Sequence, residues 1–202
     1  MKPVVAIARR ELESYLAGPL GWLCLFGFVG VTGLFFALIL TEYNIQAASA
    51  PMYMGMEDGP NLDEWVVQPF FANTGVILLL LCPALSMRLF AEDRRQRSLE
   101  LLMSSPLRTS QIVLGKYLGA LGFLGVLLGA TLHYALILVF LGEPDVGILA
   151  SCYASTFLLS AAFLAVGMLT SAFTENQVVA LVLGFGLLMV LWVLTWAESF
   201  AP

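Results

Sequence analysis

Charged residues are scarce in this chain of 202 residues, and long stretches of it contain no lysine or arginine at all. Only 11% of the residues are charged, whereas 60% are hydrophobic. All nine basic residues lie in two stretches, residues 2–10 and 88–116. Several uncharged runs reach the roughly 20 residues that a helix needs to cross about 30 Å of hydrocarbon. This composition excludes a soluble protein and predicts an all-α integral membrane protein.

The distribution of charge predicts which side of the membrane each segment occupies. Short loops that are rich in lysine and arginine stay on the cytoplasmic side, so both basic stretches and the N-terminus should be cytoplasmic. Nine basic and six acidic residues then lie inside, a net charge of 9 − 6 = +3, and the other eight acids lie outside. Because no basic surface extends beyond the membrane face, we expect no nucleic-acid partner.

Motifs for catalysis are also missing. The chain has no G-x-x-x-x-G-K-[ST] phosphate loop, no nucleophile elbow and no H-E-x-x-H motif, and Gly115-Lys116 is followed by tyrosine. The three cysteines, at positions 24, 82 and 152, all fall within apolar runs, where cysteine behaves as a small buried hydrophobe. The chain is therefore expected not to be an enzyme by itself, and to bind neither a cofactor nor a metal.

His133 is the only histidine and lies in the middle of an apolar run. Ionisable groups within a membrane span are functional candidates, and a proton-coupled carrier would need such a group. A proton relay also needs further titratable partners, which the apolar runs lack. We therefore favour a neutral, hydrogen-bonded packing role for His133.

The order of polar and apolar segments predicts one transmembrane domain covering residues 1–202. Residues 3–17 form an amphipathic helix suited to a membrane surface, and Gly18-Pro19 ends it. Pro83 is expected to bend the second span, Thr109 to cap the third, and Lys116 to reach the cytoplasm or the head groups. The expected spans are residues 20–40, 70–90, 110–141, 148–173 and 178–196, with an external loop at 41–69 and a cytoplasmic segment at 91–108. Cleavage of a signal peptide is disfavoured because the first run is too long.

A stripe of glycines runs along one side of the third span. Small residues let helix backbones approach closely in lipid, where packing holds helices together. Packing within the chain is the favoured role, and a surface that faces a substrate or a second subunit is the alternative. The stripe consists of Gly115, Gly119, Gly122, Gly125 and Gly129.

The inner segment at residues 90–119 is charged and amphipathic, and its apolar side chains need a surface to cover them. It could lie on anionic lipid or dock a soluble protein. Its motifs are S-L-E-L-L at 98–102, S-P-L at 105–107 and I-V-L-G-K at 112–116. Together with A-R-R-E-L at 8–12 and the order of the spans, they resemble the ABC-2 type permeases, and most closely their gliding-motility and nitrous-oxide-reductase maturation branch.

This resemblance implies that the chain is the permease subunit of an ATP-driven exporter in a bacterial inner membrane. Two permease subunits, identical or different, would pair, and each would dock a cytoplasmic ATP-binding subunit that holds ATP and Mg²⁺. The loop between spans two and three would act as a short coupling helix. The family usually has six spans, whereas this sequence shows five. By position, the implied docking residues are Arg94, Arg95, Ser98, Leu99, Glu100, Leu101 and Leu102.

A membrane scaffold or assembly factor is the alternative function. Such a protein would use the same inner loop to recruit a soluble partner without any transport. The spans contain no charged or aromatic-lined site that would identify a substrate.

Overall fold

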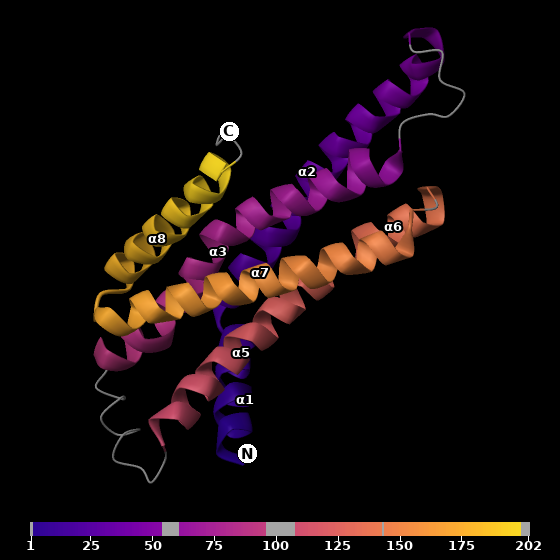
Figure 1. Ribbon diagram of the computed structural model, residues 1–202. Coiled ribbons are helices and arrows are strands. Elements are labelled where there is room, and N and C mark those ends of the chain that lie inside the picture. Colours follow the sequence, from indigo (N-terminus) through magenta and orange to yellow (C-terminus); the bar gives the residue numbers. More distant parts are fainter. Residues whose placement is uncertain (1, 54–60, 96–107, 143, 199–202) are drawn as a thin grey trace. The chain divides into compact units, whose positions relative to one another are not determined.

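The computed structural model describes residues 2–53, 61–95, 108–142 and 144–198, and these residues form helices and short turns (Figure 1). The elements in chain order are α1 (Lys2–Ala17), α2 (Pro19–Tyr53), the short π-helix η1 (Asp63–Val67), α3 (Gln68–Arg95), α5 (Thr109–Ala130), α6 (Leu132–Gly142), α7 (Val146–Phe173) and α8 (Gln177–Glu198).

Within the described ranges, five helical segments are long and apolar enough to cross a membrane. Each has at least 18 residues, and a helix of that length with few charges can span the hydrocarbon core. The prediction of an all-α integral membrane protein with five such helices is confirmed. The segments are Pro19–Ala48, Asp63–Ala91, Thr109–Phe140, Val146–Phe173 and Gln177–Leu194.

The predicted external loop at 41–69 needs a correction, because α2 continues through residue 53. Residues 41–53 are polar enough to leave the hydrocarbon, yet they include several alanines, which favour a helix. Thr41 bonds the carbonyl of Ala37, and Gln46 bonds Glu42 one turn earlier at 3.1 Å. The end of the apolar run therefore does not mark the end of the helix.

The predicted third span at 110–141 corresponds to the observed segment Thr109–Phe140, within which a turn at Thr131 separates α5 from α6. The amide of Thr131 bonds the carbonyl of Leu128 at 3.0 Å, three residues earlier, as in a tighter 3₁₀ turn. Its hydroxyl bonds the same carbonyl at 2.7 Å, and the hydroxyl of Tyr153 bonds the carbonyl of Thr131 at 3.0 Å. Two hydroxyls thus occupy carbonyls at this turn, the hydroxyl of Thr131 itself and that of Tyr153 from α7, and together they account for the break.

The chain divides into two compact units. The first unit comprises Met1–Trp22, Leu78–Leu124 and Leu159–Pro202, and the second comprises Leu23–Ile77 and Gly125–Leu158. The first unit thus contains α1, α8 and the parts of α3 and α5 that border residues 96–107.

The second unit has an aromatic core. Phe36 meets Phe70 edge to face, with ring centroids 5.7 Å apart, and Phe71 meets Tyr153 in the same way at 4.7 Å. The hydroxyl of Tyr134 donates to the backbone carbonyl of Val29 at 2.8 Å, so this buried polar group is satisfied. These contacts join α2, α3, α6 and α7 within the unit.

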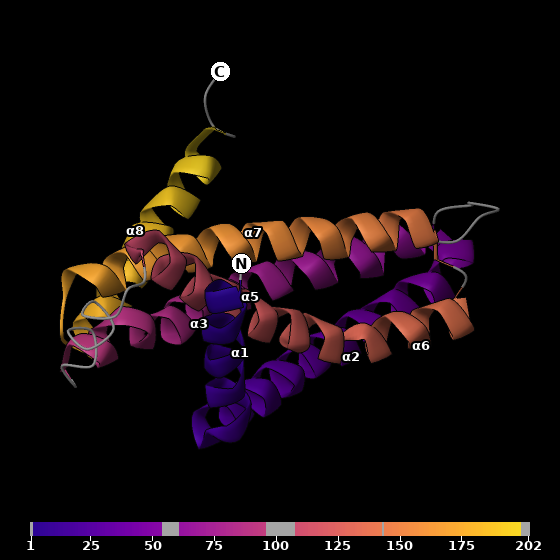
Figure 2. The same cartoon turned by 90° about the horizontal axis from the view of Figure 1, so that it is seen from below.

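In the first unit, α3 and α7 lie side by side in both views (Figures 1 and 2). Glycine permits this close packing, because a Cβ atom on Gly167 would overlap the hydroxyl of Ser86. Gly184 on α8 likewise brings that helix within van der Waals distance of Thr170 and of Pro83 on α3. Small residues at such crossings are typical of helices that associate in membranes.

Candidate functional site: the helix ends that flank residues 96–107

The structure leaves most of the predicted docking motif undescribed but places its two flanks. Arg94 and Arg95 are the last two residues of α3, and their side chains are not described. Ser98, Leu99, Glu100, Leu101 and Leu102 lie outside the described residues. The chain is described again from Arg108, and α5 begins at the next residue. The site that can be built from contacts is therefore the helical base from which this segment emerges.

The first turn of α5 is closed by a side chain that the sequence analysis did not select. The backbone amide of Arg108, the residue before the helix, donates to the side-chain oxygen of Gln111 at 3.2 Å. This is the returning half of a capping box, in which the third helical residue satisfies the amide of the capping residue. The expectation that Thr109 caps the helix is thus corrected, because Thr109 is already its first residue.

Helix α1 crosses α5 over the first part of the glycine stripe (Figure 2). A Cβ atom on Gly119 would lie 2.5 Å from the Cβ of Glu11 and 2.8 Å from the carbonyl oxygen of Ala8. One on Gly115 would lie 2.7 Å from the Cβ of Ile7. Real Cβ atoms do not approach other atoms this closely, so α1 can occupy this position only because both residues are glycine.

The rest of the stripe has other surroundings. A Cβ atom on Gly122 would make an ordinary contact with Leu12 at 3.6 Å. Cβ atoms on Gly125 and Gly129 would meet no described atom within 4 Å. The stripe is therefore covered by α1 at its first residues, whereas its last two glycines are open within the described part of the chain.

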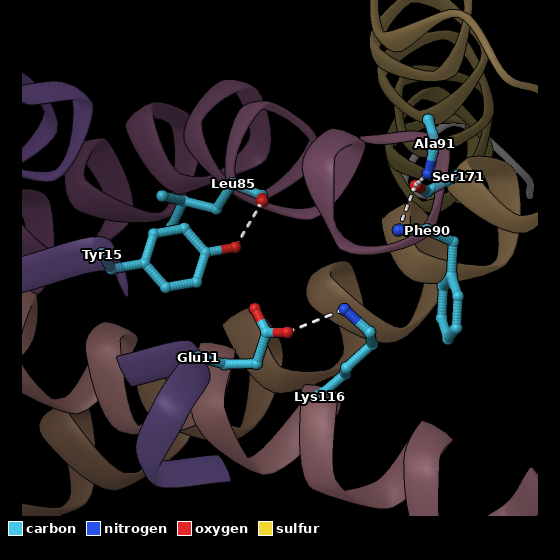
Figure 3. Close-up of polar contacts among 7 residues, drawn as sticks. All are labelled: Glu11, Tyr15, Leu85, Phe90, Ala91, Lys116 and Ser171. Carbon is cyan, nitrogen blue, oxygen red and sulfur yellow. Dashed lines mark hydrogen bonds and ion pairs between the residues drawn. The ribbon is translucent and has the colours of Figure 1, made fainter. Parts of the chain in front are cut away.

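An ion pair joins α1 to α5 between the first two glycines (Figure 3). The Nζ of Lys116 lies 2.7 Å from Oε1 of Glu11. The side chain of Lys116 is only 4% exposed and that of Glu11 is 21% exposed. The same Nζ lies 5.7 Å from the ring centroid of Phe90 on α3, within the range of a cation–π contact. Lys116 therefore links α5, its own helix, to α1 and to α3, the other helix that flanks residues 96–107.

Lys116 is buried against other described residues, since the residue as a whole is 3% exposed, and its expected place in the cytoplasm or the head groups stays a prediction. Its position early in a helix that is longer than the membrane is thick suggested an exposed side chain. Helix α1 covers that face of α5 and supplies a carboxylate, which satisfies the buried ammonium group.

Tyr15 forms a second link between α1 and the flanking helices. Its hydroxyl donates to the carbonyl of Leu85 on α3 at 2.7 Å, and its ring stacks on Phe123 of α5 at 4.9 Å between centroids. The hydrogen bond is visible in Figure 3. Tyr15 is buried, so its apolar ring and its polar tip are both satisfied.

Ser171 of α7 holds the end of α3. Its Oγ accepts hydrogen bonds from the backbone amides of Phe90 at 3.2 Å and Ala91 at 3.1 Å (Figure 3). The same oxygen donates to the carbonyl of Met87 at 3.0 Å. Helix α3 is thus tied to α7 about one turn before it ends at Arg95.

These contacts hold the helices that border residues 96–107 in place, and they do not form a catalytic centre. Both helices that border residues 96–107 are joined to α1, and both are also joined to α7, α3 through Ser171 and α5 through the hydroxyl of Tyr117, which donates to the carbonyl of Ala161 at 2.9 Å. Sequence reasoning named none of Glu11, Tyr15, Lys116 and Ser171 as site residues. A lysine within an apolar run, with glycine one residue before it and three residues after it, was the one signal that could have indicated a buried cation.

Two further ionisable groups, His133 and Asp63, lie in the second unit. His133 is exposed, its ring lies tilted against that of Tyr134, and its Nδ1 is within hydrogen-bonding distance of the Ala130 carbonyl. Asp63, the first residue of η1, is 9% exposed, and its Oδ2 accepts a hydrogen bond from the amide of Asp145 at 3.3 Å. Within the described ranges, no group of three or more His, Cys, Asp or Glu residues could hold a metal ion.

Comparison with known proteins identifies a family for nearly the whole chain. A family model described as "ABC-2 family transporter protein" matches residues 5–197. Searches of curated proteins and of solved structures find no match.

Proposed function

The chain belongs to the ABC-2 transporter family and is a membrane permease, and from this premise we propose that it docks a separate ATP-binding subunit through residues 91–108 and exports a substrate. The permease itself is the transport component and not the catalytic one. ATP and Mg²⁺ would be held by the partner, since the sequence has no phosphate loop.

The observation that carries this proposal is the attachment of both flanks of the docking segment to buried helices. On one side Ser171 holds the amides of Phe90 and Ala91, and on the other Lys116 is paired with Glu11. A force applied to residues 96–107 would therefore move packed helices and not only the segment itself. Packed interfaces move between discrete arrangements, as a transport cycle requires.

The remaining parts of the assembly follow from the same proposal. The basic loop and the N-terminus lie on the cytoplasmic side of a bacterial inner membrane, by the positive-inside rule. A second permease subunit, identical or different, completes the pathway. The open glycines of the stripe, Gly125 and Gly129, are candidates for that contact, since small residues promote helix association in lipid.

The test is co-purification of the full-length permease with its ATP-binding subunit in nanodiscs, with bound proteins identified by mass spectrometry. Leu101→Asp and Glu100→Lys should abolish capture of the ATPase, because the first removes an apolar contact and the second reverses a charge. The matched control is Glu175→Lys, which makes the same charge reversal at an exposed turn on the same expected side of the membrane.

Three outcomes separate the possibilities. Loss of the ATPase in the two loop variants and its retention in the control supports docking through this segment. Capture that is unchanged in the loop variants refutes it. A captured protein that neither binds nor hydrolyses ATP would instead identify a scaffold that recruits a soluble partner.

A further inference from the structure

The Glu11–Lys116 ion pair has a specific position with respect to the proposed docking segment. Lys116 lies about two turns into α5, counted from Thr109, and Phe90 lies about one turn before the end of α3 at Arg95. The Nζ of Lys116 contacts the carboxylate of Glu11 and faces the ring of Phe90. Three helices thus meet at a single ammonium group, near the described ends of α3 and α5.

Stability alone does not explain a pair of this kind. Removing two charges from water is costly, and buried pairs can often be replaced by apolar residues without loss of stability. What a buried pair does supply is a fixed register, because it is satisfied only when the two helices meet at one place. The glycines on either side of Lys116 add to this constraint, since they let the backbone of α1 approach α5 at that place.

The helices that α1 contacts indicate the role of this fixed register. Helix α1 bonds α5 through Glu11 and bonds α3 through Tyr15, whose hydroxyl donates to the Leu85 carbonyl at 2.7 Å. Without the ion pair, the stacking of Tyr15 on Phe123 would still hold α1 against α5, but the two helices could slide. Dispersion contacts are not directional, whereas a charge-assisted hydrogen bond at 2.7 Å is.

We propose that Glu11 and Lys116 are positioning residues for energy coupling. Their ion pair keeps α1, the start of α5 and the end of α3 in one register, so that a displacement at residues 96–107 is transmitted to all three helices. This inference rests on the proposed docking of an ATP-binding subunit at that segment. It assigns to the N-terminal helix a part in coupling that depends on one buried contact.

The experiment uses the full-length permease in nanodiscs with the ATP-binding subunit that co-purifies with it. The Kd of the two proteins is measured together with kcat and KM for ATP hydrolysis by the complex. The variants are Glu11→Gln, Lys116→Met and the exchange Glu11→Lys with Lys116→Glu. The matched control is Glu13→Gln, which removes an exposed carboxylate that pairs with Arg9 on the same helix.

Glu11→Gln and Lys116→Met should each lower kcat by roughly fivefold or more while Kd and KM stay within about twofold of the wild type, since docking is intact and only transmission is impaired. The exchange should recover at least about half of the lost kcat, because it restores an ion pair of opposite polarity. Glu13→Gln should leave every value unchanged. A role in packing alone would not be rescued by exchanging the charges.

Wild-type kcat in both single variants overturns the inference, and so does a lowered kcat that the exchange fails to recover. If Lys116→Met does not fold, Glu11→Gln decides the question, because glutamine keeps the size and shape of glutamate. Failure of the wild-type permease to bind an ATP-binding subunit refutes the proposed function itself. Wild-type coupling with unaffected variants refutes only the role of the ion pair.

Discussion

Replacing Gly119 by alanine is the sharpest test of how α1 sits on α5. The new methyl group would lie 2.5 Å from the Cβ of Glu11 and 2.8 Å from the carbonyl oxygen of Ala8. The second contact is with backbone, so it cannot be relieved by turning a side chain. We expect α1 to be displaced and the Glu11–Lys116 pair to be weakened.

The magnitude follows from a comparison with Gly125 on the same helix. A Cβ atom there meets no described atom within 4 Å, so Gly125→Ala adds a methyl group without overlap. Both substitutions gain about 1 kcal/mol of helix propensity, and this gain cancels between them. Overpacking costs about 1–3 kcal/mol and applies only at Gly119. The two variants should therefore differ by about 1–3 kcal/mol, or roughly 5- to 150-fold in the folding equilibrium.

The measurement is reversible unfolding in mixed micelles, followed by helical circular dichroism as denaturing detergent is added. Gly122→Ala belongs in the same series and should behave like Gly125→Ala, because its Cβ would make an ordinary contact with Leu12 at 3.6 Å. Gly115→Ala should resemble Gly119→Ala. If Gly119→Ala is as stable as Gly125→Ala, α1 does not pack over this part of α5, and the argument for the coupling site is wrong.

Three further predictions concern single contacts. Gly21→Ala should disrupt the turn between α1 and α2, because the new Cβ would overlap the Tyr15 carbonyl oxygen. Its melting temperature should be lower than that of Gly27→Ala, whose Cβ would meet no described atom within 4 Å. Asp63→Asn should stabilise the protein by about 1 kcal/mol, since Oδ1 of this buried carboxylate has no hydrogen-bond partner among the described residues and an amide is less costly to bury than a charge; an unchanged or lower melting temperature would contradict this. Ser171→Ala should lower the free energy of unfolding, measured in detergent, by about 1 kcal/mol, because it removes the acceptor for two amides of α3. Ser155→Ala should lower it much less, because Ser155 is exposed and bonds the Cys152 carbonyl on its own helix.

The membrane-spanning helices could be predicted from the sequence because hydrophobic length is a local property. The predicted spans 70–90 and 148–173 lie within the observed segments Asp63–Ala91 and Val146–Phe173. The polar extension of α2 to Tyr53 could not be predicted in the same way. Helix α2 continues after the apolar run ends, so the hydropathy of the sequence does not predict the residue at which α2 ends. The break at Thr131 depends on Tyr153, which comes from another helix.

The region proposed to couple ATP hydrolysis to transport, around Glu11, Lys116 and residues 96–107, was also only partly predictable from the sequence. The motif at residues 98–102 and the glycine stripe are visible in the sequence, but the sequence does not show that α1 covers Gly115 and Gly119 and leaves Gly125 open. The pairing of Lys116 with Glu11 could not be predicted, because Glu11 lies 105 residues earlier in the chain.

The sequence by itself determined an all-α membrane protein, because each span is stabilised by its own apolar length and by hydrogen bonds within its own helix. The tertiary structure decided which polar groups are buried together. Glu11 meets Lys116, Tyr15 meets Leu85 and Ser171 meets Phe90 only when α1, α3, α5 and α7 are packed. Such pairings depend on how closely helices approach, which is set by the glycines at their crossings and by the side chains of every helix involved.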